Sequence, residues 1–298
     1  MPSYAGQTGC SSSLKSVKAS ATTSETGAFS GEFSPPPSRA ARAATDLVEG
    51  LRNRWLWTSL AIQDIKLRYR GSILGPFWIT ISTVVMIAVM GVLYARLFQT
   101  EVATYLPFLT VGLVVWQFVS TIITEGCTTF LSVQGIIQQV RMPFSIHAYR
   151  LVCRNLLILA HNFAVVPIVL VIFRTPLDWH VITVVPALVV LAVNGVWVSI
   201  LFGMISARFR DVPPIVASFV QVAFLVTPIF WSAHLLGVWK PLAELNPLFA
   251  AIDVVRAPLL GSAPAPNSWF VLLAVTLLGG GVTFAFFARF RARIAFWV

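Results

Sequence analysis

Charged residues are scarce in this sequence: they make up 11% of its 298 residues, while hydrophobic residues make up 57%. Soluble globular proteins are charged at about a quarter of their positions. A surface with so few charges is poorly suited to water, which argues against an ordinary soluble enzyme. The composition therefore predicts an integral membrane protein, whose solvent is lipid.

Lysine, cysteine and histidine are also rare, and their positions exclude several kinds of site. A P-loop nucleotide site requires a lysine directly after a glycine, and none of the four lysines has that neighbour. The three cysteines form no C-x-x-C pair, and the four histidines lie far apart, so neither set indicates a metal site. We expect no catalytic residue, no cofactor-binding residue and no metal ligand in this chain.

Acidic residues number only eleven, and none lies in the middle of a long apolar segment. Glu125 and Asp211 stand at segment ends, while Asp178 and Asp253 stand in connecting loops. Proton- or sodium-coupled carriers normally hold an ionisable group near the bilayer midplane. The energy for any transport is therefore expected to come from outside this chain.

Six charge-free segments approach or exceed the roughly 20 residues that a membrane-spanning helix needs. They cover residues 77–95, 102–124, 155–173, 181–207, 212–233 and 268–288. The sequence therefore predicts an all-α integral membrane fold with six transmembrane helices. A further apolar run, residues 245–252, is too short to span and is interpreted as a re-entrant or interfacial piece.

The distribution of lysine and arginine predicts the topology. With the N-terminus inside and six spans, 17 of the 21 basic residues fall in the inner segments. Positive charge accumulates on the cytosolic side of membrane proteins, so both termini are expected in the cytosol, at the cytoplasmic (inner) membrane. The net charge of +10 is then a topology signal that faces anionic membrane lipids, and we expect no nucleic-acid partner.

The region before the first span divides into two parts. Residues 1–44 are rich in Ser, Thr, Ala and Pro, and are predicted to form a disordered cytosolic tail before a membrane domain at 45–298. From 46 to 70, apolar residues recur every three or four positions, which predicts a basic amphipathic helix lying in the membrane interface. Asp46 and Glu49 resemble a capping pair at its start. A helix that packs on a soluble partner is the alternative.

A short helix of about two and a half turns is expected at residues 131–140, between the second and third spans, because Pro143 stops helical structure there. On the predicted topology it lies in the cytosol. Such a helix suits contact with a soluble motor subunit, and an ordinary loop helix is the alternative.

Three segments carry a resemblance to a known family. They are the run from Asp64 to Trp78 (DIKLRYRGSILGPFW), residues 138–144 (QQVRMPF), and residues 245–248 (LNPL) followed by Arg256 and 259–261 (LLG). In this order they resemble the ABC-2 type permeases that export polysaccharides, including O-antigen, capsule and teichoic acid. Gln139 stands where a lysine is common in that family. The resemblance covers about residues 46–290.

The resemblance implies a permease subunit of an ATP-driven exporter that moves a lipid-linked polysaccharide, such as the O-antigen of lipopolysaccharide. It implies pairing with a second copy and with two copies of a separate ATPase subunit that binds ATP and magnesium. Residues 131–144 would be the coupling helix, and 231–268 would form periplasmic re-entrant gate helices. The ATPase contacts would be Gln138, Val140, Arg141, Met142, Pro143 and Phe144.

A path for sugars requires aromatic rings and hydrogen-bonding groups, because sugar C–H faces stack on rings while their hydroxyls need polar partners. The candidates in the predicted spans are Trp78, Trp116, Asn194, Trp197, Phe224, Phe230 and Trp231. The alternative for each is packing against lipid or a neighbouring helix. Gly279-Gly280-Gly281 permits close helix approach and is interpreted either as a bend or as a packing site for the dimer.

Two other functions compete with glycan export. One is an ABC-2 exporter of lipids or drugs. The other, from a different class, is a membrane-embedded glycan-processing enzyme, which needs a catalytic acidic or nucleotide-binding cluster. The outer loops hold only the scattered residues Glu101, Asp178, Glu244 and Asp253, so the sequence favours a transport subunit without its own ATPase site.

Overall fold

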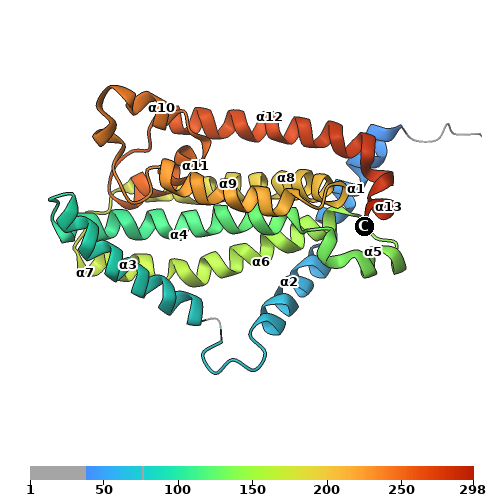
Figure 1. The fold of residues 1–298 in the computed structure, drawn as a ribbon, viewed down its shortest axis with the longest axis horizontal. Coiled ribbons are helices and arrows are strands. Elements are labelled where there is room, and N and C mark those ends of the chain that lie inside the picture. Colours follow the sequence, from blue (N-terminus) through green and yellow to red (C-terminus); the bar gives the residue numbers. More distant parts are fainter. Residues whose placement is uncertain (1–37, 76) are drawn as a thin grey trace, which may run out of the picture. The chain divides into compact units, whose positions relative to one another are not determined.

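A computed structural model describes residues 38–75 and 77–298 of the chain, and all regular structure within them is helical, as predicted. Figure 1 shows the long helices running beside one another, with short helices at both ends of the bundle. The long helices are α3 (Phe77–Leu97), α4 (Val102–Cys127), α6 (Ser145–Phe163) with its continuation α7 (Val165–Ile172), α8 (Val184–Arg208) and α12 (Pro266–Phe290).

Five helical segments in the described residues are long and apolar enough to cross a membrane: Phe77–Leu97, Val102–Cys127, Ser145–Ile172, Trp179–Arg208 and Pro266–Trp297. The remaining expected span, 212–233, which is the fifth in sequence order, is shorter. Helix α9 (Val212–Val226) has 15 residues, about 22 Å at 1.5 Å per residue, against an apolar thickness of about 30 Å.

The early end of α9 has a local cause. Pro228 cannot continue the helical hydrogen bonding, and proline disfavours helical dihedrals in the residue before it. Thr227 is accordingly extended, with φ −81° and ψ 135°. The predicted span 212–233 is therefore not one continuous helix: it breaks before Pro228, and residues 227–232 form a non-helical segment.

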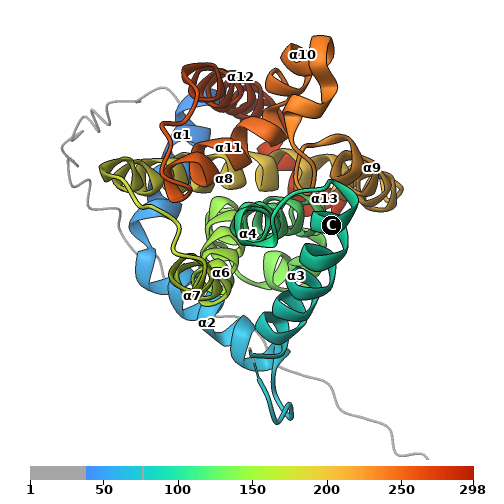
Figure 2. The ribbon, with the colours of Figure 1, turned by 90° about the vertical axis from the view of Figure 1, so that its left-hand side faces the viewer.

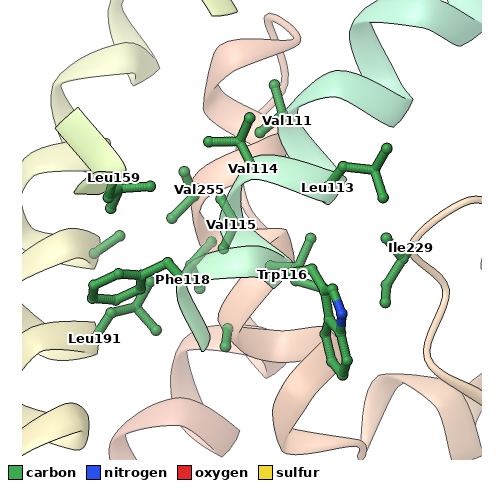
Figure 3. Packing of buried hydrophobic residues seen from close by; sticks show 14 of the residues in the cluster. Val111, Leu113, Val114, Val115, Trp116, Phe118, Leu159, Leu191, Ile229 and Val255 are labelled. Atoms are coloured by element: carbon green, nitrogen blue, oxygen red, sulfur yellow. The ribbon is translucent and has the colours of Figure 1, made fainter. Parts of the chain in front are cut away.

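Helix α4 is the centre of the bundle and is buried along most of its length. It contacts α3, α6, α8, α9 and α11 (Pro247–Leu259), and Figure 3 shows Val111, Leu113 and Phe118 projecting from it in different directions. Small residues let backbones approach: a Cβ on Gly112 would lie 2.9 Å from the carbonyl oxygen of Ile229. In lipid such close packing, rather than transfer out of water, holds helices together.

The triple glycine of α12 takes part in close packing within the chain. A Cβ on Gly279 would lie 2.5 Å from the Trp197 ring of α8, whereas Gly280 and Gly281 face open space. Close packing at Gly279 is thus made within one chain, between α8 and α12, whereas the predicted alternatives were a bend or a packing site for the dimer.

The N-terminal amphipathic segment differs from its prediction. It forms two helices, α1 (Arg39–Arg52) and α2 (Arg54–Arg68), which meet at Asn53. Helix α1 begins at Arg39, where the Ser38 side chain accepts a hydrogen bond from Ala41 N at 3.1 Å, so the expected capping pair at Asp46 was wrong. Residues 39–44, expected in the tail, are helical, and residues 1–37 lie outside the described residues.

The two ends of the bundle differ in charge. One end, called the basic end below, carries α1, α2, α5 (Gln134–Gln139) and α13 (Ile294–Trp297), together with the arginines that close α8 and α12 (Figure 1). The opposite end, called the far end, carries the short helix α10 (Lys240–Glu244). The remaining short elements are the 3₁₀ helices η1 (Leu131–Val133), η2 (Trp179–Thr183), η3 (Ala233–Trp239) and η4 (Arg291–Arg293).

Candidate functional site

An open groove lies between the central helix α4 and the helices α3 and α9, which Figure 2 shows at one side of it. Its cavity volume is about 760 Å³. It brings together three predicted path residues, Trp78, Trp116 and Phe224, one from each helix. Hydroxyl and amide side chains line it as well: Ser82, Thr83, Gln117, Ser120 and Gln221.

Aromatic rings continue from this groove toward the far end. Consecutive ring centroids are 5.3–6.3 Å apart in this series, within the range of favourable aromatic pairs. The aromatic series consists of Trp116, Phe224, Phe230, Tyr94, Phe98, Tyr105 and Phe108. It ends at a second cavity of about 520 Å³, which Phe98, Tyr105 and Phe108 help to line.

The non-helical segment 227–232 supplies Phe230 to this series and is held by side chains. Arg256 Nη1 donates to the Pro228 carbonyl at 3.0 Å, and the Tyr105 hydroxyl donates to the Phe230 carbonyl. Non-helical backbone at membrane depth is tolerated only where other protein groups form hydrogen bonds with its free N–H and C=O groups. Arg256 is 4% exposed, and its guanidinium lies 4.0 Å from the Phe108 ring centroid. This arginine therefore positions segment 227–232 and touches the aromatic series.

The other predicted path residues lie elsewhere. Trp231 donates from Nε1 to the Leu225 carbonyl at 3.2 Å. Asn194 and Trp197 lie on α8, where Trp197 Nε1 donates to Asn194 Oδ1 at 2.9 Å, and Asn194 Nδ2 donates to Thr276 Oγ1 of α12 at 2.7 Å. The structure gives these two residues a packing role between α8 and α12, and they do not line the groove.

The predicted ATPase contacts project from the basic end. The expected helix at 131–140 is present as η1 and α5, followed by non-helical residues before α6. Gln138, Val140 and Arg141 are exposed, whereas Met142, Pro143 and Phe144 are half-buried. The Phe144 ring packs edge-on against Phe130, at 6.4 Å between centroids. The coupling segment, residues 134–144, thus has an exposed tip and an anchored base.

Asp46 anchors that base, and sequence reasoning missed this role. Its fully buried carboxylate accepts hydrogen bonds from Phe144 N at 3.1 Å and Ser145 N at 3.0 Å, at the start of α6. It also pairs with Arg291 Nε at 2.6 Å. A carboxylate that accepts from these first N–H groups stabilises a helix N-terminus. The only sequence signal was that Phe144, at the N-cap of α6, cannot cap with its own side chain.

An ion-pair cluster ties α2, α4 and α6 together beside the coupling segment. Asp64 pairs with Arg150 and, at 3.1 Å, with Arg154, while Glu125 pairs with Arg154 at 2.6 Å and Arg68 at 2.7 Å. Burial raises the pKa of the Asp64 carboxyl, but the hydrogen bonds and positive charges of Arg150 and Arg154 outweigh it and hold the pKa below its usual value. Asp64 and Arg68 are four residues apart, a spacing that favours a pair within one helix, yet both bind other helices.

Metal ligands were not expected. In residues 38–75 and 77–298, no group of three or more His, Cys, Asp or Glu side chains is placed to hold a metal ion.

Comparison with known proteins gives one family and a consistent set of relatives. Residues 56–260 match the ABC-2 type transporter family. An O-antigen export system permease protein, RfbA, from Myxococcus xanthus is 25% identical over 211 residues, which cover 68% of this chain and 80% of that protein. A protein of the same name from Klebsiella pneumoniae is 24% identical over 196 residues, 61% of this chain and 74% of that protein.

Proposed function

Because the chain belongs to the ABC-2 type transporter family, we propose that it is the permease subunit of an exporter that moves a lipid-linked polysaccharide such as O-antigen. Members of this family are multi-pass transport subunits. In the proposal, two copies of a separate ATPase hydrolyse ATP-Mg beneath two copies of this chain. The names of the relatives support the substrate class.

The observation that supports this function best is the groove between α3, α4 and α9. Aromatic rings stack on sugar faces, and hydroxyl and amide groups replace the water that sugar hydroxyls lose. Because successive sugars present similar faces, the aromatic series binds a chain without holding one unit in place. An amide facing hydrocarbon is costly, so the exposed Gln221 is better explained by a polar path than by lipid. Gln117 Oε1 already accepts from Thr83 and Asn162.

A second copy of the chain completes the proposed path. The groove is open on one side, and α3 and α9 border it with apolar residues such as Val85, Val89 and Phe219, all more than half exposed. Two grooves facing each other across a twofold axis would enclose one polar channel between apolar borders. Closure by a partner, rather than by lipid, keeps the polar lining out of hydrocarbon.

The proposed orientation places the basic end in the cytosol of the inner membrane and the far end in the periplasm. Helix α9 and segment 227–232 would together make the fifth of the six crossings. Helix α11 is largely buried against α4, α8 and α12, and with η3 and α10 it would form the re-entrant gate. The bond from Arg256 to the Pro228 carbonyl would link this gate to the aromatic series.

The coupling segment is the proposed seat of the ATPase, with Gln138, Val140 and Arg141 at its exposed tip. Movement of an ATPase subunit would be transmitted through Phe144 and Asp46 to α6, α1 and η4, which meet there. Apolar exposure supports this docking: the side chains of Ile136 and Val140 are 39% and 50% exposed at the basic end.

The test uses the chain reconstituted in vesicles with its ATPase and supplied with lipid-linked polysaccharide. Replacing Phe224 by alanine removes a ring from the groove, and we expect polysaccharide-stimulated ATP hydrolysis to fall roughly tenfold, the effect of losing about 1.4 kcal/mol of stacking. Phe270→Ala is the control, since Phe270 is also an exposed phenylalanine (72%) but lies on α12, outside the groove and its borders. Equal activity of the two variants would remove the groove from the path. Stimulation by lipophilic drugs and not by glycan would favour the alternative exporter.

A further inference from the structure

A small polar pocket lies at the basic end, beside the ion-pair cluster, and no step of glycan movement has used it. Its volume is about 200 Å³. Helices α2, α4 and α6 contribute its charged residues, and the turn after α4 contributes hydroxyls. The lining consists of Arg68, Glu125, Thr128, Thr129, Ser132, Val133, His147, Arg150, Leu151 and Arg154.

The carboxylate oxygens at this pocket already accept hydrogen bonds. One oxygen of Glu125 accepts from Arg68, and the other accepts from Arg154 at 2.6 Å and from Asn155 at 3.1 Å. Both oxygens of Asp64, behind the pocket, accept from arginines as well. These carboxylates therefore have little capacity left for a cation or for another donor.

Several hydrogen-bond donors near the pocket, in contrast, have no acceptor. Arg150 Nη1, Arg154 Nε, Thr129 Oγ1 and both ring nitrogens of His147 are buried, and none has a hydrogen-bond partner among the residues that the structure describes. One of the two His147 nitrogens is a donor in the neutral ring. His147 and Thr129 are 3% and 4% exposed. Buried polar groups in proteins are nearly always hydrogen-bonded, so several unpaired donors around one cavity indicate a missing acceptor.

Charge and size specify that acceptor. Three arginines face two carboxylates in the cluster, which leaves one positive charge in excess and disfavours a metal cation. The pocket is several times the roughly 30 Å³ that one water occupies in the liquid. Arginine forks match tetrahedral oxyanions, which accept from several directions at once.

We propose that this pocket binds a phosphate group. The phosphate would accept from Arg150, Arg154, Thr129 and His147 once their unpaired donors turn toward the cavity, because those atoms have almost no accessible surface in the described structure, and it would neutralise the excess charge. It would come from a lipid headgroup at the membrane surface or from phosphate in solution. The inference does not depend on which polymer the protein exports.

The test measures the thermal unfolding midpoint of the full chain in a non-ionic detergent, with rising inorganic phosphate against sodium chloride of equal ionic strength. A parallel series uses vesicles of phosphatidylglycerol against vesicles of a phosphate-free galactolipid. Replacing an arginine would break ion pairs and threaten folding. Thr129→Val and His147→Leu instead remove donors that make no hydrogen bond in the described structure. Thr110→Val, an equally buried threonine outside the pocket, is the matched control.

We expect phosphate to raise the midpoint of the wild type and of Thr110→Val, with about tenfold weaker apparent affinity in Thr129→Val and His147→Leu. A response to dissolved phosphate identifies phosphate in solution as a ligand, and a response to phosphatidylglycerol alone identifies the lipid headgroup. No response in either series, or an undiminished response in both pocket variants, would overturn the proposal.

Discussion

Replacing Asp46 by alanine tests how the coupling segment is anchored. The substitution removes the acceptor of two N–H groups at the start of α6 and the partner of Arg291, and so frees two separate parts of the chain from α1. It leaves the exposed tip, Gln138 to Arg141, unchanged. The expected result is a less stable protein in which the base of the coupling segment loosens.

The magnitude follows from the burial of each group. Loss of a helix N-cap costs about 1 kcal/mol, and the cost rises toward about 3 kcal/mol when an N–H is left buried without an acceptor, as that of Ser145 would be. Arg291 has a side chain 31% exposed, so water can hydrate it and its lost pair adds at most about 1 kcal/mol. We expect a total loss of about 2–4 kcal/mol.

The assay is the apparent unfolding midpoint of the purified chain at a fixed heating rate, because membrane proteins often unfold irreversibly. At about 2–4 °C per kcal/mol, the expected drop is about 5–15 °C. Glu49→Ala, an exposed acidic residue one turn along the same helix, should leave the midpoint nearly unchanged. If Asp46→Ala falls no further than Glu49→Ala, the carboxylate does not anchor α6 as argued.

Three further predictions address other contacts. Arg141→Glu should weaken co-purification with the ATPase and lower export, with membrane insertion intact, and normal export by the variant would refute the coupling role. Gly279→Ala should destabilise the chain by about 1–3 kcal/mol because its Cβ would clash with Trp197. Gly280→Ala, whose Cβ would point into open space, should be neutral or slightly stabilising. Equal unfolding midpoints of the two variants would contradict this packing. Asp64→Asn should lower the unfolding midpoint by an amount that stays constant from pH 8 to 5. A carboxyl with a lowered pKa loses its stabilising charge only as the pH falls below about 4. A difference from the wild type that disappears near pH 6 would contradict this prediction.

The local sequence decided which segments form apolar helices. Runs without charge predicted five of the spanning helices, although their ends moved by several residues, and the break at Pro228 has a cause visible in the dipeptide Thr227-Pro228. The motif from Asp64 to Trp78 pointed to the ABC-2 type permeases, the family that residues 56–260 match. Each of these inferences uses a property of a continuous stretch, such as its hydropathy or its order of residues.

Tertiary structure alone decided which side chains meet. Asp46 caps a helix that begins 99 residues later and pairs with Arg291, 245 residues away. Trp116 joins the groove while Trp197, a similar candidate by sequence, packs between α8 and α12. The physical reason is that lipid and the protein interior are both apolar. Whether a segment enters the membrane depends on its composition, which can be read from the sequence. The rotation of a helix that is apolar on all sides depends on small residues and polar pairs contributed by other helices, which only the assembled bundle brings together.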